Sequence, residues 1–203
     1  MRIYKKSPRI ASNTFQNLKG FDTNTIISFA QAIHLKKTGY TFCIRYTSHT
    51  ALKRPNDLSF IEAKNILNAG LSLSVIHRIR SPDWKPNTNS GIIDGQNIVR
   101  NAITIGLPLN MNIWCDLKGV SSDTSPQNLV AYCNAWYDTV FNTGYIPGLY
   151  IKEDCSFNSN KLYQNIKYKN LKFKNYWKPL SKESLITNHQ YQLIQSLKHI
   201  PKE

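Results

Sequence analysis

The chain has 203 residues, of which 41% are hydrophobic and 19% are charged, so it can bury the core of one domain or at most two small ones. This composition excludes intrinsic disorder and collagen-like order. Lysine and arginine number 26 against 12 aspartates and glutamates, which gives a net charge of +14 and a long-range attraction for polyanions. Nucleic acid, an anionic envelope polymer and an acidic glycan all suit such a field.

The N-terminal residues are basic but lack the apolar stretch of a signal peptide. Lys5, Lys6 and Arg9 are followed by no apolar run of roughly 7–15 residues, and no segment reaches the roughly 18 apolar residues of a membrane span. We therefore expect a protein that is made in the cytoplasm without a signal peptide or membrane span. Residues 1–18 are predicted to form a basic arm, and residues 19–203 a single domain.

The sequence alternates between short apolar runs and segments of helical period, which is typical of repeated β-α units around a parallel sheet. The predicted strands are the segment that ends at Asp22 and residues 40–46, 71–79, 112–117 and 145–151. The predicted helices are residues 25–37, 59–69, 94–105 and 126–141. After Lys152 the alternation weakens, and only residues 171–177 and 189–197 resemble core segments.

Local signals define several of the helix ends. Ser59 and Glu62 have the spacing of a capping box, in which the serine caps an exposed amide and the glutamate reaches back. Residues 81–91, rich in Pro, Asn and Ser, are expected to form a loop. The apolar face of the helix predicted over residues 25–37 is expected to consist of Ile26, Phe29, Ala30 and Ile33.

Cysteines and histidines give no sign of a disulfide framework or a metal site. Cys43, Cys115, Cys133 and Cys155 are sparse and widely spaced, so we expect buried thiols. No pair of histidines has the i, i+4 spacing of a zinc-binding helix. We predict neither a metal nor a cofactor.

Two acidic residues fall at the ends of predicted strands. Asp22 ends the first strand and Asp116 the fourth, and in parallel α/β folds the carboxyl ends of strands meet on the face where function is built. Burying a carboxylate is costly unless it is paired or hydrogen-bonded, which favours a functional role for both. The alternative is that each aspartate caps the following helix or neutralises a nearby lysine.

Several short motifs occur in a recognisable order along the chain. They are GFDT at 20–23, RY at 45–46, Gly91 and Asp94, LP at 107–108, NIWCDLKG at 112–119, NAW at 134–136, GYIPGLY at 144–150, YW at 176–177 and HQY at 189–191. Together they resemble the glycoside-hydrolase-like barrel family numbered 1906 among domains of unknown function, over residues 20–193. That family is related to the (β/α)-barrel lysozymes that cleave the peptidoglycan backbone. The resemblance implies a small, partly reduced TIM-type (β/α) barrel with a sugar groove at the carboxyl ends of its strands.

In those relatives a carboxylate ends the first strand and an Asp-x-Glu motif ends the fourth. Asp22 and Asp116 match two of these positions, whereas Lys118 stands at the third. A lysine is a poor general acid, and its charge beside an oxocarbenium-like transition state adds about 1–4 kcal/mol to the barrier. We therefore predict Glu153, which follows the fifth strand, as the substitute acid; the alternative is a solvated loop charge.

Aromatic side chains are expected to form the binding surface, because sugar rings pack their C–H faces on aromatic rings. Trp114 shares a strand face with Asp116 by period-two alternation, whereas Tyr132 and Trp136 lie inside a predicted helix and are expected in the core. The predicted substrate contacts are Arg45, Tyr46, Trp84, Trp114, Lys118, Trp177, Gln190 and Tyr191.

The leading functional hypothesis is a cell-wall-directed protein that hydrolyses peptidoglycan or a related amino-sugar polymer with Asp22, Asp116 and Glu153. The partners would be the wall glycan and other anionic envelope polymers, reached after release or secretion. The first alternative is a catalytically inactive glycan-binding module, because Lys118 occupies the acid position. A less favoured third is a basic nucleic-acid-binding protein, since ten lysines after Tyr150 are interleaved with aromatic residues.

Overall fold

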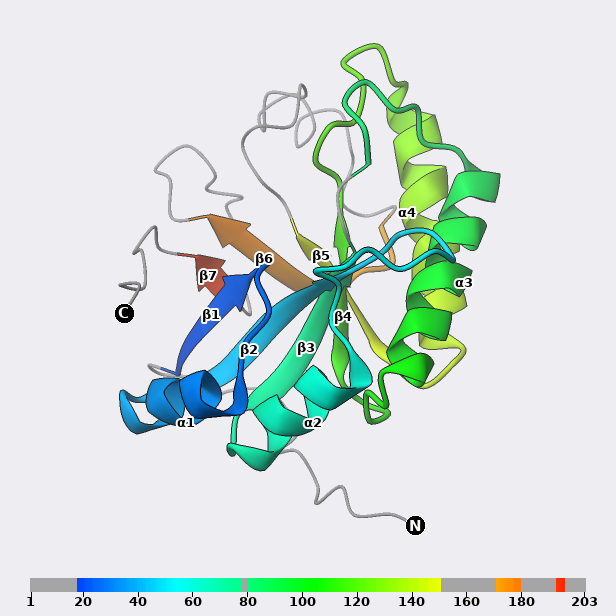
Figure 1. Ribbon diagram of the computed structural model, residues 1–203. Helices are drawn as coiled ribbons and strands as arrows, with labels where there is room; N and C mark the ends of the chain where they lie inside the picture. Colours follow the sequence, from blue (N-terminus) through cyan, green and yellow to red (C-terminus); the bar gives the residue numbers. More distant parts are fainter. Residues whose placement is uncertain (1–17, 78–79, 151–170, 180–192, 196–203) are drawn as a thin grey trace.

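The computed structural model describes residues 18–77, 80–150, 171–179 and 193–195, of which 178–179 and 193–195 are described by their backbone alone. Seven parallel strands pair in chain order from β1 to β7 and form one curled sheet (Figure 1). The strands are β1 (Lys19–Thr23), β2 (Tyr40–Thr47), β3 (Ser72–His77), β4 (Asn112–Asp116), β5 (Ile146–Tyr150), β6 (Asn175–Pro179) and β7 (Leu193–Gln195). The sequence-based prediction of a partly reduced TIM-type barrel is confirmed.

Helices connect the first five strands and lie outside the sheet. They are α1 (Phe29–Lys37), α2 (Phe60–Asn68), α3 (Thr88–Thr104) and α4 (Pro126–Phe141). Figure 1 shows α1 beside α2, and α3 packed along α4 at another side of the sheet. Within the described residues, no helix is long and apolar enough to cross a membrane.

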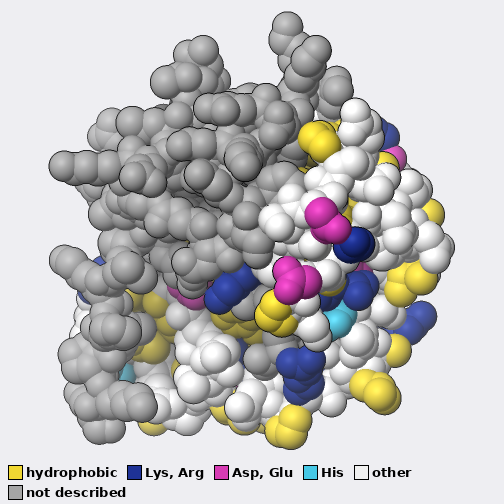
Figure 2. All heavy atoms as spheres, turned by 90° about the horizontal axis from the view of Figure 1, so that it is seen from above, with side chains coloured by type: hydrophobic (Ala, Val, Ile, Leu, Met, Phe, Trp, Pro, Cys, Tyr) yellow, Lys and Arg dark blue, Asp and Glu magenta, His cyan; other side chains and the backbone are white. Residues whose placement is uncertain are grey.

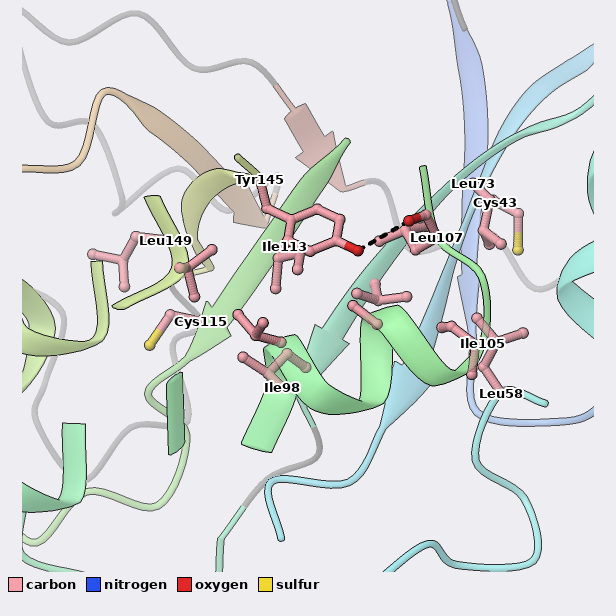
Figure 3. Close-up of a cluster of buried hydrophobic side chains, with 14 of the residues drawn as sticks. Cys43, Leu58, Leu73, Ile98, Ile105, Leu107, Ile113, Cys115, Tyr145 and Leu149 are labelled. Atoms are coloured by element: carbon pink, nitrogen blue, oxygen red, sulfur yellow. Dashed lines mark hydrogen bonds between the residues drawn. The ribbon is translucent and has the colours of Figure 1, made fainter. Parts of the chain in front are cut away.

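The two faces of the sheet bury different side chains. Alternate strand residues point outward into a large core with the helices, where Cys43, Leu73 and Ile113 are fully buried and the Tyr145 hydroxyl donates to the Leu107 carbonyl at 2.9 Å (Figure 3). The residues between them point inward and form a smaller, mainly aromatic cluster. Its buried members are Ile44, Ile76, Trp114, Tyr150 and Trp177.

The helix α3 begins earlier than the sequence pattern indicates. We predicted a loop over residues 81–91 and a helix from Asp94, but Asn87 and Ser90 form a capping box and the helix starts at Thr88. The predicted loop included Gly91, but this glycine lies inside α3 and lets the helix approach α4 closely, because a Cβ on Gly91 would lie 2.4 Å from the Tyr132 carbonyl oxygen. Packing between helices therefore overrides the local preference of these residues.

Two predictions at α1 and α2 were wrong in detail. The buried residues of α1 are Ala32 and Leu35, whereas the predicted core residues Ile26 and Phe29 are exposed. Ser59 caps α2 as predicted, but the Glu62 carboxylate does not reach back to it. It turns inward to a buried arginine, because that charge needs a partner in the core.

The other assignments of buried residues agree with the structure. Helix α4 has Ser125 as its N-cap and Pro126 in its first turn, and Tyr132 and Trp136 are fully buried. Cys43, Cys115 and Cys133 are buried free thiols, and burial raises the pKa of Cys133 to about 12. Such thiols are unreactive at neutral pH. Cys155 lies outside the described residues.

Candidate active site

The carboxyl ends of β4, β5 and β6 place a carboxylate beside an aromatic wall. Asp116 is the last residue of β4 and pairs with Tyr150 of β5, which in turn pairs with Trp177 of β6. The rings of Tyr150 and Trp177 lie 4.1 Å apart, and Trp114 meets Trp177 edge to face at 5.7 Å. The structure thus brings the predicted residues Asp116, Trp114 and Trp177 together on the interior face.

Backbone contacts hold Asp116 in place at the end of β4. Its side chain is only 2% exposed, and Oδ1 accepts the backbone N–H of Lys118 at 2.9 Å. From the neighbouring strand, Nε2 of His77 lies 2.9 Å from both the backbone nitrogen and the carbonyl oxygen of Asp116. The carboxylate is therefore positioned by the turn that follows β4 and by the ring of β3.

Burial favours the neutral form of the His77 imidazole. Desolvation lowers its pKa below the ordinary value of 6.5, against a smaller opposing effect of the Asp94 carboxylate. The ring packs edge to face on Trp136 of α4, with 5.8 Å between the ring centroids. A neutral imidazole can hold the end of β4 in either tautomer, as an acceptor of the amide proton or a donor to the carbonyl.

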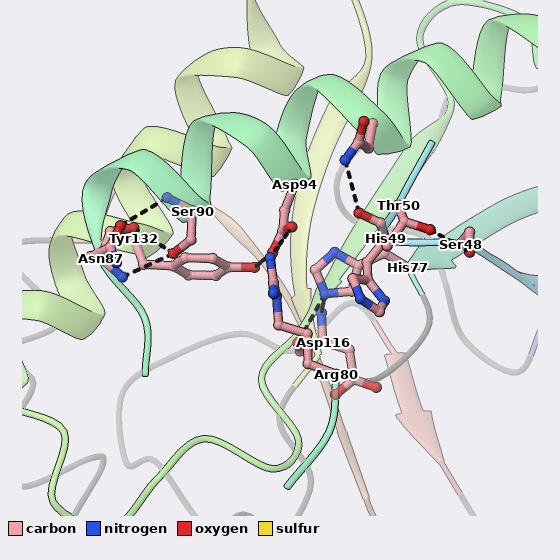
Figure 4. A network of polar contacts seen from close by, with 11 residues as sticks. Ser48, His49, Thr50, His77, Arg80, Asn87, Ser90, Asp94, Asp116 and Tyr132 are labelled. Carbon is pink, nitrogen blue, oxygen red and sulfur yellow. Dashed lines mark hydrogen bonds and ion pairs between the residues drawn. The ribbon is translucent and has the colours of Figure 1, made fainter. Parts of the chain in front are cut away.

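A partly buried ion pair lies next to this histidine, between the end of β3 and the two long helices (Figure 4). Arg80 makes a two-pronged contact with Asp94 of α3, whose Oδ2 also accepts the Tyr132 hydroxyl of α4 at 2.8 Å. The guanidinium of Arg80 also lies over the ring of Trp84, 5.3 Å from its centroid. The loop after β3 is thereby fixed to α3 and α4.

The loops after β3 and β4 are joined to each other at the same end of the barrel. The Trp84 indole donates to the Lys118 carbonyl at 3.1 Å, and the Trp84 backbone bonds both Gly119 and Ser121. Gly119 has φ of +80°, which a side chain would strain. Figure 2 views this end from above, and where side chains are described, acidic, basic and histidine side chains lie near one another.

Asp22 shares the interior face with Asp116. It pairs with Ile44 of β2, which belongs to the interior cluster, while its neighbour Phe21 packs in the outer core. Unlike Asp116, Asp22 is half-buried. The two aspartates thus lie on the same side of the sheet, on the first and fourth strands.

Arg45 is a correction to the predicted substrate contacts. Its side chain is fully buried on the outer face, where it pairs with Glu62 at 2.7 Å and donates to the Thr23 and Asn56 carbonyls. It therefore holds β1, the loop after β2 and α2 together and has no access to a ligand. Its neighbour Tyr46 points the other way and packs against the interior cluster.

The remaining predicted residues divide into two groups. Trp84 and Lys118 are partly exposed in the joined loops and stay candidates for substrate contact. Glu153, Gln190 and Tyr191 lie outside the described residues. In the part of the chain that the structure describes, no three His, Cys, Asp or Glu side chains are grouped to hold a metal ion.

Sequence reasoning missed two residues of this site. Tyr150 shares a strand face with Gly148 and ends β5 beside Asp116, so period-two alternation could have found it. The predicted strand over residues 71–79 runs past His77, whereas His77 is the last residue of β3. Its contact with Asp116 spans 39 positions of sequence and leaves no local signal.

The curled parallel sheet with helices outside it is that of a partial (β/α)-barrel protein. Residues 33–201 match the Rv2525c-like, glycoside hydrolase-like domain, and the chain belongs to that family. This confirms the resemblance found in the sequence. The comparison with curated proteins gives no match.

Solved structures with the same fold include two from bacteria and one from a bacteriophage. An uncharacterized protein of B. stearothermophilus has a TM-score of 0.62 and 21% identity, with 86% of this chain and 83% of that chain covered. The Mycobacterium tuberculosis Tat-secreted protein Rv2525c, solved with HEPES, has a TM-score of 0.59 and 16% identity, with 84% and 82% covered. The catalytic domain of endolysin ply40 from Listeria monocytogenes bacteriophage P40 has a TM-score of 0.55 and 15% identity, with 82% and 75% covered.

Proposed function

We propose that this protein acts at the cell envelope, where it binds and hydrolyses the glycan strands of peptidoglycan or a related amino-sugar polymer. The observation that carries the proposal is the arrangement at the strand ends, where Asp116 lies beside the rings of Tyr150 and Trp177 and on the same face as Asp22. Membership of a glycoside hydrolase-like family and the fold shared with a phage endolysin support it.

In this proposal the two aspartates have different tasks. Asp116 is held by the Lys118 amide and the His77 ring, which suits a carboxylate that must meet the positive charge developing at the sugar carbon. Asp22, being half-buried, is better placed to exchange protons with water or to orient the substrate. Glu153 remains the proposed acid that protonates the leaving oxygen.

The test is the release of new reducing ends from purified peptidoglycan. Asp116→Asn and Asp22→Asn should each lower the rate at least 100-fold, because in this proposal each carboxylate has a task that the other two do not perform. Glu153→Gln should lower it similarly. The matched control is Asp138→Asn, which changes an exposed carboxylate on α4 that pairs with Lys172 and lies away from the strand ends. If the wild-type protein releases no reducing ends, the proposed hydrolase activity is wrong.

The second candidate is a glycan-binding module without catalytic activity. Two observations favour it. Lys118 occupies the position where the barrel lysozymes related to this family carry a carboxylic acid, and Asp116 has low exposure. This candidate predicts co-sedimentation with insoluble peptidoglycan without release of reducing ends. If Lys118→Glu gains hydrolytic activity, the chain is a former hydrolase in which the lysine has replaced the general acid. If Lys118→Gln loses binding to peptidoglycan, the Lys118 ammonium contacts the glycan directly.

A further inference from the structure

Four large apolar side chains are exposed where α1 and α2 begin. Ile26 and Phe29 stand at the start of α1, and Phe60 and Ile61 open α2. Each is between 44% and 71% exposed. Soluble proteins seldom leave several large apolar side chains together in water without a partner for them.

The starts of the two helices, which carry these side chains, lie side by side. The backbone N–H of Ile27 donates to the Glu62 carboxylate at 2.8 Å, which ties the turn before α1 to the first turn of α2. Figure 1 shows the two helices next to each other at the same side of the sheet. The four exposed apolar residues thus flank this contact, two at the start of each helix.

Within residues 24–70, every exposed charged side chain is positive. In residues 24–70 both acids, Asp57 and Glu62, are buried, with Asp57 accepting the Arg54 backbone N–H and Glu62 pairing with an arginine. Lys64 follows Phe60 and Ile61 on the same face of α2. The exposed charged side chains of this stretch are Lys36, Lys37, Lys53, Arg54 and Lys64.

We propose that this surface, named here the apolar-basic surface (Ile26, Phe29, Phe60 and Ile61, with Lys36, Lys37 and Lys64 of the same two helices), docks the protein on an anionic lipid membrane. The apolar side chains would enter the interfacial region, and the basic ones would contact headgroup phosphates. The proposal does not depend on the sugar chemistry at the strand ends.

The combination of charge and apolar exposure favours a lipid surface over other partners. A second copy of the chain would bring two positively charged surfaces together, which like charges oppose. An anionic glycan would engage the lysines but leave Phe60 and Ile61 in water. An anionic bilayer satisfies both kinds of side chain at once.

The experiment is co-sedimentation of the full chain with vesicles. Equal parts of phosphatidylglycerol and phosphatidylcholine serve as the anionic surface, and phosphatidylcholine alone as the neutral one. The wild type should bind the anionic vesicles at least tenfold more tightly than the neutral ones. Ile61→Asp should weaken binding about tenfold or more, and Lys64→Gln about fivefold.

Matched controls separate this surface from the general positive charge of the protein. Ile103→Asp changes a similarly exposed isoleucine on α3, and Arg100→Gln removes one exposed charge from the same helix. Both should bind as the wild type does, within about twofold. If Ile61→Asp and Ile103→Asp lose affinity equally, or if the wild type ignores anionic vesicles, the proposal is overturned. A dimer that Ile61→Asp dissociates in size-exclusion chromatography would instead assign the surface to self-association and would also overturn it.

Discussion

Two arginine-carboxylate pairs anchor neighbouring helices to the sheet in different surroundings. Arg45 of β2 pairs with Glu62 of α2, and the side chains are 0% and 3% exposed. Arg80, in the loop after β3, pairs with Asp94 of α3, and its side chain is 28% exposed while that of Asp94 is 1% exposed. The first pair is closed off by protein, whereas the second opens towards the strand ends.

The difference shows that burial decides which groups an arginine-carboxylate pair can contact. The guanidinium of Arg45 makes four hydrogen bonds to Glu62 and two backbone carbonyls and is fully buried, so a ligand cannot reach it. Arg80 keeps part of its side chain in solvent, beside Trp84 and near the loop of Lys118. Four predictions test this comparison, in order of expected effect.

Arg45→Met should cause the largest loss. It leaves the Glu62 carboxylate buried without its counter-ion, which should lower the free energy of unfolding by about 3–5 kcal/mol in urea denaturation. The double variant Arg45→Met/Glu62→Gln removes both charges and keeps an acceptor for the Ile27 amide, so it should recover much of the loss. A double variant no more stable than the single one would contradict this explanation.

Arg80→Met should cost less, about 1–3 kcal/mol in the same measurement. Asp94 keeps the Tyr132 hydroxyl at 2.8 Å, and water can reach the space that the partly exposed arginine leaves. Tyr132→Phe, which removes only that hydroxyl, provides the complementary variant. Equal losses for Arg80→Met and Arg45→Met would remove the distinction between the two pairs.

The buried His77 beside the second pair should make stability depend on pH. Because burial lowers its pKa in the folded state, the unfolded chain binds a proton first as the pH falls through about 6.5. The free energy of unfolding should therefore decrease below pH 6.5, by up to about 1.4 kcal/mol per pH unit from this group. His77→Gln should flatten that part of the profile, and an unchanged slope would place the dependence elsewhere.

The smallest effect is expected at an exposed pair on the joined loops. Lys85 and Asp123 lie 2.7 Å apart, with side chains 69% and 61% exposed. Water and salt screen such a pair, so Asp123→Asn should leave the urea midpoint unchanged within error. A clear shift would mean that the loops after β3 and β4 depend on this contact more than their backbone bonds indicate.

Much of the fold could be predicted because the sequence pattern and the packing agree. The run from Asn112 to Asp116 is apolar enough to be buried on both faces, and Ser125 with Pro126 marks the start of α4 directly. The start of α3 could not be predicted in the same way. Gly91 is a breaker by local preference, and only its contact with α4 explains its place inside a helix.

The candidate site could be predicted only where the alternation of side chains between the two faces of a strand was used. The position of Asp116 at a strand end followed from the apolar run before it. Applied to β2, the same alternation would have separated Arg45 from Tyr46 and turned the arginine outward. The contact that holds Asp116 could not be predicted from the sequence. It joins His77 and Asp116 on neighbouring strands that are separated in the chain by α3.

Gly148 determines what kind of opening this barrel offers. A Cβ at this position would lie 2.4 Å from the Trp114 indole, so the absence of a side chain on β5 makes room for the ring to fill the middle of the barrel. The Trp114 ring packs with Ile44, Ile76 and Trp177, so buried side chains fill the interior of the barrel at this level. The proposed substrate would therefore lie across the ends of the strands, a geometry that suits a long polymer better than a small molecule enclosed inside the barrel.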